Sequence, residues 1–223
     1  MSVIMNIDTA LETAMVSISG DGTTLQFAIS HEQKDHATWM HTAIEKILRE
    51  SGIAFHDLQA VAVNIGPGSY TGLRAGLSAA KGFCYALQIP LITISSLRLI
   101  AASVKQQANE LICPLIDARR MEVYAAVYDK ELNEILPPHA RIVDTSSFSD
   151  ILEKKSVVFC GNGCKKLKQI IPPHKNAFFS DEGPNPATMG LLSHNSFKNS
   201  DFAPLAWSEP LYLKEFYTTG RKD

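Results

Sequence analysis

The sequence predicts an α/β protein of two lobes that share one order of elements, βββαβαβα. Two observations predict it. Segments of strand composition alternate with segments of helical spacing across residues 1–108, and the same order begins again after Asn109-Glu110. With 45% hydrophobic and 20% charged residues among 223, the chain can bury a sizeable core. We therefore expect a first lobe at 1–108 and a second, diverged lobe at 109–223.

The first lobe begins with three consecutive strands and continues with alternating helices and strands. Asp21-Gly22 predicts the turn between the second and third strands. Apolar residues at helical spacing before Gly52 predict an amphipathic helix, and the unbroken apolar run at 61–65 predicts a strand covered on both faces. The expected strands are 2–7, 13–19, 23–30, 61–65 and 91–95, and the expected helices are 36–50, 70–87 and 96–107.

The second lobe repeats this order with weaker signals. The Gly-Asn-Gly segment at 161–163 predicts a loop that leads into a helix. After Ile171 the chain is rich in proline and polar residues, so the order of its elements is harder to read. The expected strands are 111–117, 122–128, 135–143 and 156–160, and the expected helices are 145–153, the one after the 161–163 loop, and 187–196.

Composition and motifs exclude several classes of function. The net charge of −2 gives no overall basic field, and the cluster Lys165, Lys166 and Lys168 is more typical of a solvated helix face than of an RNA site. No run of eighteen apolar residues occurs and no C-x-x-C spacing links the four cysteines, which favours a cytoplasmic chain with reduced cysteines. Histidine pairs of metal-binding spacing and nucleophile motifs are absent, so we expect neither a bound metal nor a finished catalytic site.

A glycine loop, GPGSYTG at 66–72, connects the buried strand to the helix that follows it. Glycines there permit close backbone approach, and free N–H groups at a helix start attract anions. A tight turn explains the same residues equally well, and the loop lacks both the Lys-Ser/Thr end of a P-loop and the dinucleotide order. The turn at Asp8-Thr9 is likewise either a metal or phosphate turn or an ordinary hairpin turn. The candidate phosphate site consists of Asp8, Thr9, Gly66, Gly68 and Ser69.

The helix after this loop carries a strip of small residues, namely Gly72, Ala75, Gly76, Ala79 and Ala80. Each glycine inside a helix costs about 1 kcal/mol relative to alanine, so close packing must compensate for it. The packing partner is either the protein's own sheet, which is the usual case, or another subunit.

Four segments carry a resemblance to a known family. They are NIGPGSYTGLRAGLSAAKGFCYALQIPLITISSL at 64–97, PLIDARRMEVYAAVYD at 114–129, FCGNGCKKL at 159–167 and EPLYLKEF at 209–216. Together they closely resemble the bacterial TsaB family, also called YeaZ, over nearly the whole chain. The GPGSYTGLR stretch is the most specific of these motifs.

The resemblance implies an actin-like fold (sugar kinase, heat-shock chaperone, actin) of two βββαβαβα lobes and a non-catalytic role. TsaB proteins pair with the metal-dependent subunit TsaD, and with the ATPase TsaE, in the complex that transfers a threonylcarbamoyl group to the adenosine beside the anticodon of tRNA. The metal-binding histidines of TsaD have no counterpart in the helix at Asp35–Arg49. No cofactor is implied for this chain, while a nucleotide at a subunit interface and direct contact with tRNA are left open.

In this family the two helices of the first lobe pack against the same helices of TsaD, and TsaB alone forms a homodimer through that face. Carried onto this sequence, the surface falls on the helices at 36–49 and 70–87, which gives the small-residue strip a partner. The tail after Asp181 diverges from the family, so its role is not carried over. The expected interface residues are Met40, Ile44, Ile47, Tyr70, Gly72, Leu73, Gly76, Leu77, Ala80 and Phe83.

Two other functions compete with this interpretation. An ATPase or small-molecule kinase would use Asp8 and the loop at 66–72, but glycine phosphate turns are missing at 8–12 and 117–120. An actin-fold peptidase would need metal ligands or an activated nucleophile, and the sequence offers neither.

Overall fold

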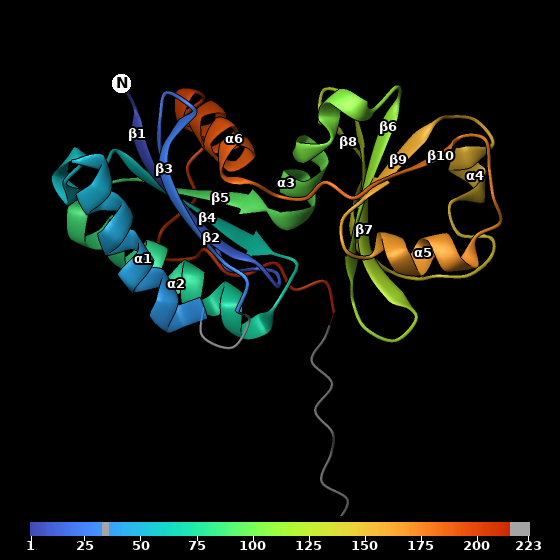
Figure 1. Cartoon of the computed structure of the whole chain (residues 1–223), viewed down its shortest axis with the longest axis horizontal. Coiled ribbons are helices and arrows are strands. Elements are labelled where there is room, and N and C mark those ends of the chain that lie inside the picture. Colours follow the sequence, from blue (N-terminus) through green and yellow to red (C-terminus); the bar gives the residue numbers. More distant parts are fainter. Residues whose placement is uncertain (33–35, 215–223) are drawn as a thin grey trace, which may run out of the picture.

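The computed structural model describes residues 1–32 and 36–214 and consists of two lobes side by side (Figure 1). Each lobe is built on a five-stranded mixed sheet. Asp35, at the start of one expected helix, lies outside the described residues, as do Glu215 and Phe216 at the end of the last family motif. No helix in the described part of the chain is both long and apolar enough to cross a bilayer.

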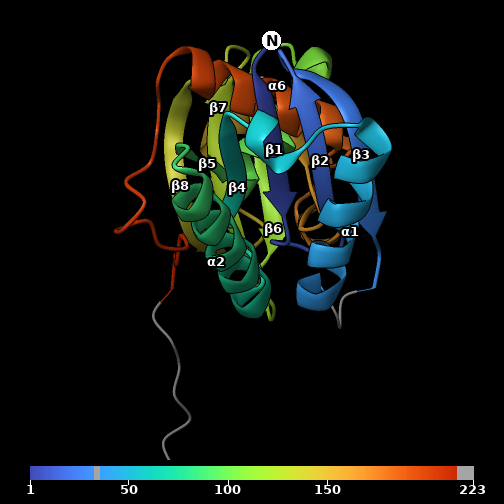
Figure 2. The same cartoon turned by 90° about the vertical axis from the view of Figure 1, so that its left-hand side faces the viewer.

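The first sheet has the strand order β3-β2-β1-β4-β5, in which β1 runs antiparallel to β2 and parallel to β4. Its two central strands, β1 and β4, are almost entirely buried because helices cover both faces. Figure 2 shows α1 and α2 side by side over one of these faces. The elements are β1 (Val3–Asp8), β2 (Ala14–Gly20), β3 (Thr23–Ser30), α1 (His36–Ser51), η1 (Phe55–Asp57), β4 (Ala60–Gly66), α2 (Tyr70–Leu87) and β5 (Leu91–Ser95).

The second sheet has the order β8-β7-β6-β9-β10, which is the order of the first sheet repeated strand for strand. This repetition confirms the duplicated βββαβαβα order that was expected for an actin-like fold. The edge strand β10 escaped the sequence prediction because it is short and lies in the proline-rich segment. The elements are β6 (Leu111–Asp117), β7 (Glu122–Asp129), β8 (Glu134–Ile142), α4 (Ser149–Leu152), β9 (Val157–Cys160), α5 (Cys164–Ile170) and β10 (Ala177–Ser180).

Two of the expected helices are shorter than predicted. Helix α3 ends at Ser103, and a separate 3₁₀ turn, η2 (Lys105–Gln107), follows it. The expected helix 145–153 keeps only α4, because the Asp144 carboxylate accepts hydrogen bonds from the Ser146 amide (2.9 Å) and the Ser147 hydroxyl (3.1 Å). Such local side-chain bonds offer the backbone an alternative to the helix.

The last helix of each half packs on the sheet of the other half. Helix α3 (Ser96–Ser103) follows the first sheet, yet its apolar side chains form a core with β6 and β7 of the second. Helix α6 (Pro186–Lys198) follows the second sheet, and its Met189 and Leu192 are buried against the first, with Ile4 and Ile92 among their neighbours. The crossed helices therefore join the two lobes through apolar contact.

After α6 the chain crosses back over the first lobe as a C-terminal strap, residues 201–214. The Ala203 amide donates to Leu91 O (2.8 Å) along the edge of β5, and the Leu211 amide donates to Ile65 O (2.7 Å). At the end of the strap, Lys214 forms an ion pair with Glu122 of the second lobe. Although these residues follow the second sheet, they are held mainly by the first.

Candidate functional site

The glycine loop packs directly on the first turn of the chain. The Ser69 amide donates to Ala10 O (2.7 Å), and the Thr9 hydroxyl donates to Gly72 O (2.6 Å). The Ser69 hydroxyl accepts from the Gly72 amide (3.3 Å) and so caps the start of α2. Polar groups that would have to meet a phosphate are thus engaged within the protein.

Glycine is required in this loop because two backbone segments meet there. A Cβ added at Gly68 would overlap Ala10 O, and one added at Gly72 would overlap Thr9 O. Neither atom has room to move, because both belong to backbone held by the hydrogen bonds above. The tight-turn alternative therefore explains Thr9, Gly68 and Ser69 in this structure, and their place in a phosphate site stays a prediction. The Gly66 amide is also engaged within the protein, because it donates to Asn64 Oδ1 (2.9 Å).

Asp8, a member of the predicted phosphate site, lines a cavity. This cleft of about 640 Å³ lies between the lobes, where β1 ends near the loop at 161–165 and the segment 181–184. Burial raises the pKa of the Asp8 carboxyl, while hydrogen bonds from the Ala10 amide (2.9 Å) and the Asn64 side chain act in the opposite direction.

The charge of this cleft does not suit a polyphosphate. Its lining includes four carboxylates against one lysine, and the exposed His31 accompanies Thr13 at the rim. Negative walls repel a triphosphate unless a metal intervenes, and the described residues hold no group of three or more His, Cys, Asp or Glu side chains arranged to hold a metal ion. The lining carboxylates are Asp8, Glu12, Asp181 and Glu182, and the lysine is Lys165.

The matching turn of the second lobe, between β6 and β7, is built differently. Arg119 and Arg120 both have left-handed backbones, with φ of 65° and 47°. The Asp117 carboxylate accepts from the Arg119 amide (2.7 Å) and from Lys166 Nζ (2.8 Å). Burial acts to raise the pKa of Asp117, but these hydrogen bonds outweigh it and the pKa is lowered. The turn is closed by its own side chains and offers no glycine cradle.

Most of the expected interface residues face the protein's own sheet. Their side chains form the first lobe's core beneath α1 and α2, and a Cβ added at Gly76 would lie 2.5 Å from Thr9 Oγ1. In this structure these residues are engaged within the chain, and their assignment to a subunit surface stays a prediction. The buried residues are Met40, Ile44, Ile47, Gly72, Leu73, Gly76, Leu77 and Ala80. Of the ten, only Tyr70, which is 42% exposed, and the partly buried Phe83 reach the surface.

The outward side of α2 carries a second strip of small residues, of which Ala75 and Ala79 belong to the strip predicted from the sequence. Ser78 and Gly82 are exposed and Ala75 and Ala79 are partly so, and an added Cβ at Gly82 would meet nothing within 4 Å. The spacing i, i+3, i+4, i+7 of these four residues is the signal that separates this outer strip from the inner one.

Aromatic side chains border the outer strip at its far end. Phe83 stacks on Phe55 with ring centroids 5.6 Å apart, and the His41 ring of α1 lies 6.4 Å from Phe83. Phe55 is 41% exposed. A smooth strip beside an exposed aromatic cluster is the composition of a helix-packing surface. We call this surface the α1–α2 outer face, meaning the outer strip together with His41, Phe55 and Phe83.

The near end of α2 is tied to the C-terminal strap. Arg74 Nε donates to the Tyr212 hydroxyl (3.0 Å), and the Arg74 guanidinium lies 3.9 Å from the centroid of Tyr70. The Tyr70 and Tyr212 rings are 5.6 Å apart. The strap therefore fixes the border of the α1–α2 outer face.

Comparisons with known proteins agree with this architecture. The family model of tRNA N6-adenosine threonylcarbamoyltransferase, TsaD, matches residues 30–170. The tRNA threonylcarbamoyladenosine biosynthesis protein TsaB of Bacillus subtilis is 32% identical over 173 residues, which span 75% of this chain and 74% of that protein. TsaB of Escherichia coli is 34% identical over 134 residues, 59% of this chain and 57% of that protein.

A solved structure extends the likeness to nearly the whole chain. YeaZ from Pseudomonas aeruginosa superposes with a TM-score of 0.82, covering 96% of this chain and 100% of that one, at 22% identity. At this identity the likeness shows the fold, whereas the sequence match to the Bacillus protein shows the family. On these grounds the chain belongs to the TsaB (YeaZ) family, whose members are named for the biosynthesis of threonylcarbamoyladenosine in tRNA.

Proposed function

We propose that the protein is a non-catalytic scaffold subunit of a cytoplasmic complex that forms threonylcarbamoyladenosine in tRNA. In this proposal it pairs with a TsaD-type catalytic subunit, works with a TsaE-type ATPase, and meets tRNA through the complex. The α1–α2 outer face carries the proposal, because small residues and exposed aromatic rings lie there in one continuous surface.

The α1–α2 outer face suits a pair of partner helices. Small side chains at Ala75, Ser78, Ala79 and Gly82 let a second helix approach α2 closely, while the Phe55–Phe83 stack supplies apolar area to bury. The same face could pair two copies of this chain when the catalytic subunit is absent. The two assemblies would then compete.

A substitution at Gly82 tests the pairing. Leucine there points outward, so Gly82→Leu should leave the fold intact and block the close approach of a partner helix. We expect at least a tenfold loss of affinity for the TsaD-type subunit of the same cell in calorimetry, equivalent to about 1.4 kcal/mol. Glu153→Leu, which adds the same side chain on the exposed end of α4, is the matched control. Unchanged affinity of Gly82→Leu would refute this interface.

The competing function is nucleotide hydrolysis at the interlobe cleft, and Asp8 is the observation that favours it. Its carboxylate is buried at the end of β1 and lines the cleft. A scaffold predicts that the isolated chain turns over no ATP. Turnover by the isolated chain that is abolished in Asp8→Asn would reject the scaffold proposal.

A further inference from the structure

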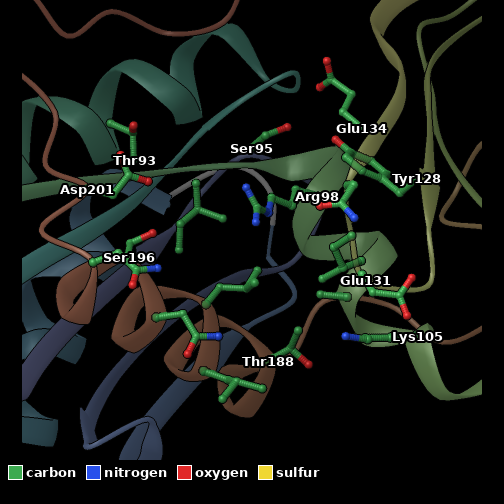
Figure 3. A pocket seen from close by; sticks show the side chains of 18 of the residues that line it. Thr93, Ser95, Arg98, Lys105, Tyr128, Glu131, Glu134, Thr188, Ser196 and Asp201 are labelled. Carbon is green, nitrogen blue, oxygen red and sulfur yellow. The ribbon is translucent and has the colours of Figure 1, made fainter.

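A second cavity, of about 850 Å³, lies on another side of the lobe junction and shares no lining residue with the Asp8 cleft. Figure 3 shows it between α3, α6 and the hairpin that joins β7 to β8. The first lobe contributes Thr93, Ser95 and Arg98, and the second contributes Tyr128 and Thr188. A ligand bound here would touch both lobes.

Charged side chains of both signs line this cavity without neutralising one another. Arg98 and Lys105 come from α3 and η2, and three carboxylates come from the hairpin and the strap. Within residues 1–32 and 36–214, no ion pair within 4.0 Å and no side-chain hydrogen bond engages any of these five groups. The carboxylates are Glu131, Glu134 and Asp201.

The balance of these charges selects the class of ligand. Two cations against three carboxylates leave the lining at −1, which disfavours a phosphate or nucleotide, and the presence of both signs favours a molecule that itself carries both charges. The wall also has an apolar part, formed by Ile94, Leu132 and Leu192, which suits a short aliphatic stem.

Hydroxyl groups complete the lining. Tyr128 is 3% exposed, and burial raises its pKa to about 12, so at neutral pH its hydroxyl stays protonated and can donate a hydrogen bond. The Ser95 hydroxyl lies beside it at the N-cap position of α3, but it caps no amide of that helix. Of these two neighbouring hydroxyls, at least one can donate its proton to an additional acceptor.

Arg98 and Asp201, which carry opposite charges, line the same cavity. In Figure 3 the Arg98 guanidinium points into the middle of the cavity, and Thr93 and Asp201 lie together at one end of it. The Asp201 backbone is fixed by its amide, which donates to Ser196 O (2.9 Å). A carboxylate beside Arg98 and an ammonium group beside Asp201 would each find an opposite charge that the protein leaves unpaired.

We propose that this cavity binds a small zwitterion of the amino-acid type, with its carboxylate on Arg98 and its ammonium group on Asp201. Recognition by two unlike charges excludes simple anions and simple amines. A simple anion would pair with Arg98 and leave Asp201 unpaired, and a simple amine would pair with Asp201 and leave Arg98 unpaired. None of the residues that line the cavity belongs to the α1–α2 outer face.

The test is binding to the full chain by calorimetry and ligand-observed NMR, with each standard L-amino acid as the probe. Propionate, propylamine and inorganic phosphate are the single-charge probes. We expect at least one amino acid to bind with a Kd of about 1 mM or tighter, and the three single-charge probes to bind at least tenfold more weakly.

Two variants separate the two ends of the site. Arg98→Gln and Asp201→Asn should each weaken the amino acid at least tenfold, and Asp201→Asn should strengthen propionate because it removes a like charge. Arg49→Gln, on the exposed end of α1, is the matched control and should change nothing. Since Arg98 and Asp201 are exposed and unpaired, neither variant should alter the melting temperature of the free chain.

Three results would overturn the proposal. They are the absence of binding by every amino acid, amino-acid binding that neither variant weakens, and phosphate binding that is as tight as the best amino acid and is lost in Arg98→Gln. The last result would show a site for anions alone. None of these results bears on the scaffold function, because the experiment contains no partner.

Discussion

Helix α2 presents small residues on two sides, and the two sides meet different neighbours. On the inner side, Gly72 and Gly76 touch the backbone and side chain of Thr9, where an added Cβ has no room. On the outer side, Gly82 faces open space. The same residue type therefore serves close packing within the chain on one side and leaves a smooth surface on the other. Spacing alone shows that a helix is lined with small residues, but not which neighbour each strip meets.

The largest difference between the two sides should appear on adding a single methyl group. Gly72→Ala places a Cβ on Thr9 O, a backbone atom that cannot yield without disturbing the turn, so we expect a loss of about 3 kcal/mol in the free energy of unfolding. Urea denaturation followed by circular dichroism measures it. A loss below about 1 kcal/mol would mean that the helix slides outward at little cost.

The second largest effect on stability should come from removing the hydrogen bond that joins the inner strip to the first turn. Thr9→Val keeps the shape of the side chain and removes the donor to Gly72 O, which we expect to cost about 1–2 kcal/mol. Thr42→Val on the exposed side of α1 is the control and should stay within about 0.5 kcal/mol of the parent. Equal effects at the two positions would show that the Thr9 bond does not hold the turn.

The buried carboxylate that precedes Thr9 should make stability depend on pH. Burial raises the pKa of Asp8 in the folded chain above the ordinary value of 3.8, so the folded state keeps the proton longer than the unfolded state. Stability should fall as pH rises from about the ordinary pKa through the raised one. Asp8→Asn cannot ionise, and we expect it to be about 1–2 kcal/mol more stable than the parent at neutral pH.

The comparison for Asp8→Asn is Glu12→Gln, which removes an exposed carboxylate from the same turn. The free energy of unfolding, measured from pH 4 to pH 8, should depend less on pH in Asp8→Asn than in the parent, and Glu12→Gln should not show this change. A neutral-pH stability of Asp8→Asn below that of the parent would show that the ionised carboxylate is needed by its neighbours Ala10 and Asn64.

The smallest effect belongs to the outer strip. Gly82→Ala adds a methyl group in open space, and it reduces the backbone freedom of the unfolded chain. Stability should therefore rise by about 0.5–1 kcal/mol. The thermal midpoints of Gly82→Ala and Gly72→Ala, measured side by side, check that the first rises and the second falls. A destabilised Gly82→Ala would remove the distinction between the two sides of α2.

Much of the fold could be predicted from the sequence. The spans 70–87, 91–95 and 111–117 coincide with α2, β5 and β6, because their apolar periods are long and their ends carry turn residues. Cys84 and Cys113 are buried, as the apolar runs around them in the sequence predicted. The candidate site was predicted less well: Asp8 lines a cleft, whereas Thr9, Gly68 and Ser69 are engaged in packing.

By itself, the sequence determined the order of the elements, the duplication and the family, because these depend on local composition and on motifs that are continuous along the chain. Only the tertiary structure decided which strip of α2 is covered, that α3 and α6 cross to the opposite sheets, and that Arg98 and Asp201 share one cavity. The physical reason is that these contacts join residues far apart in the sequence, such as Ile4 and Met189. Their partners are chosen by shape and burial, which no local pattern records.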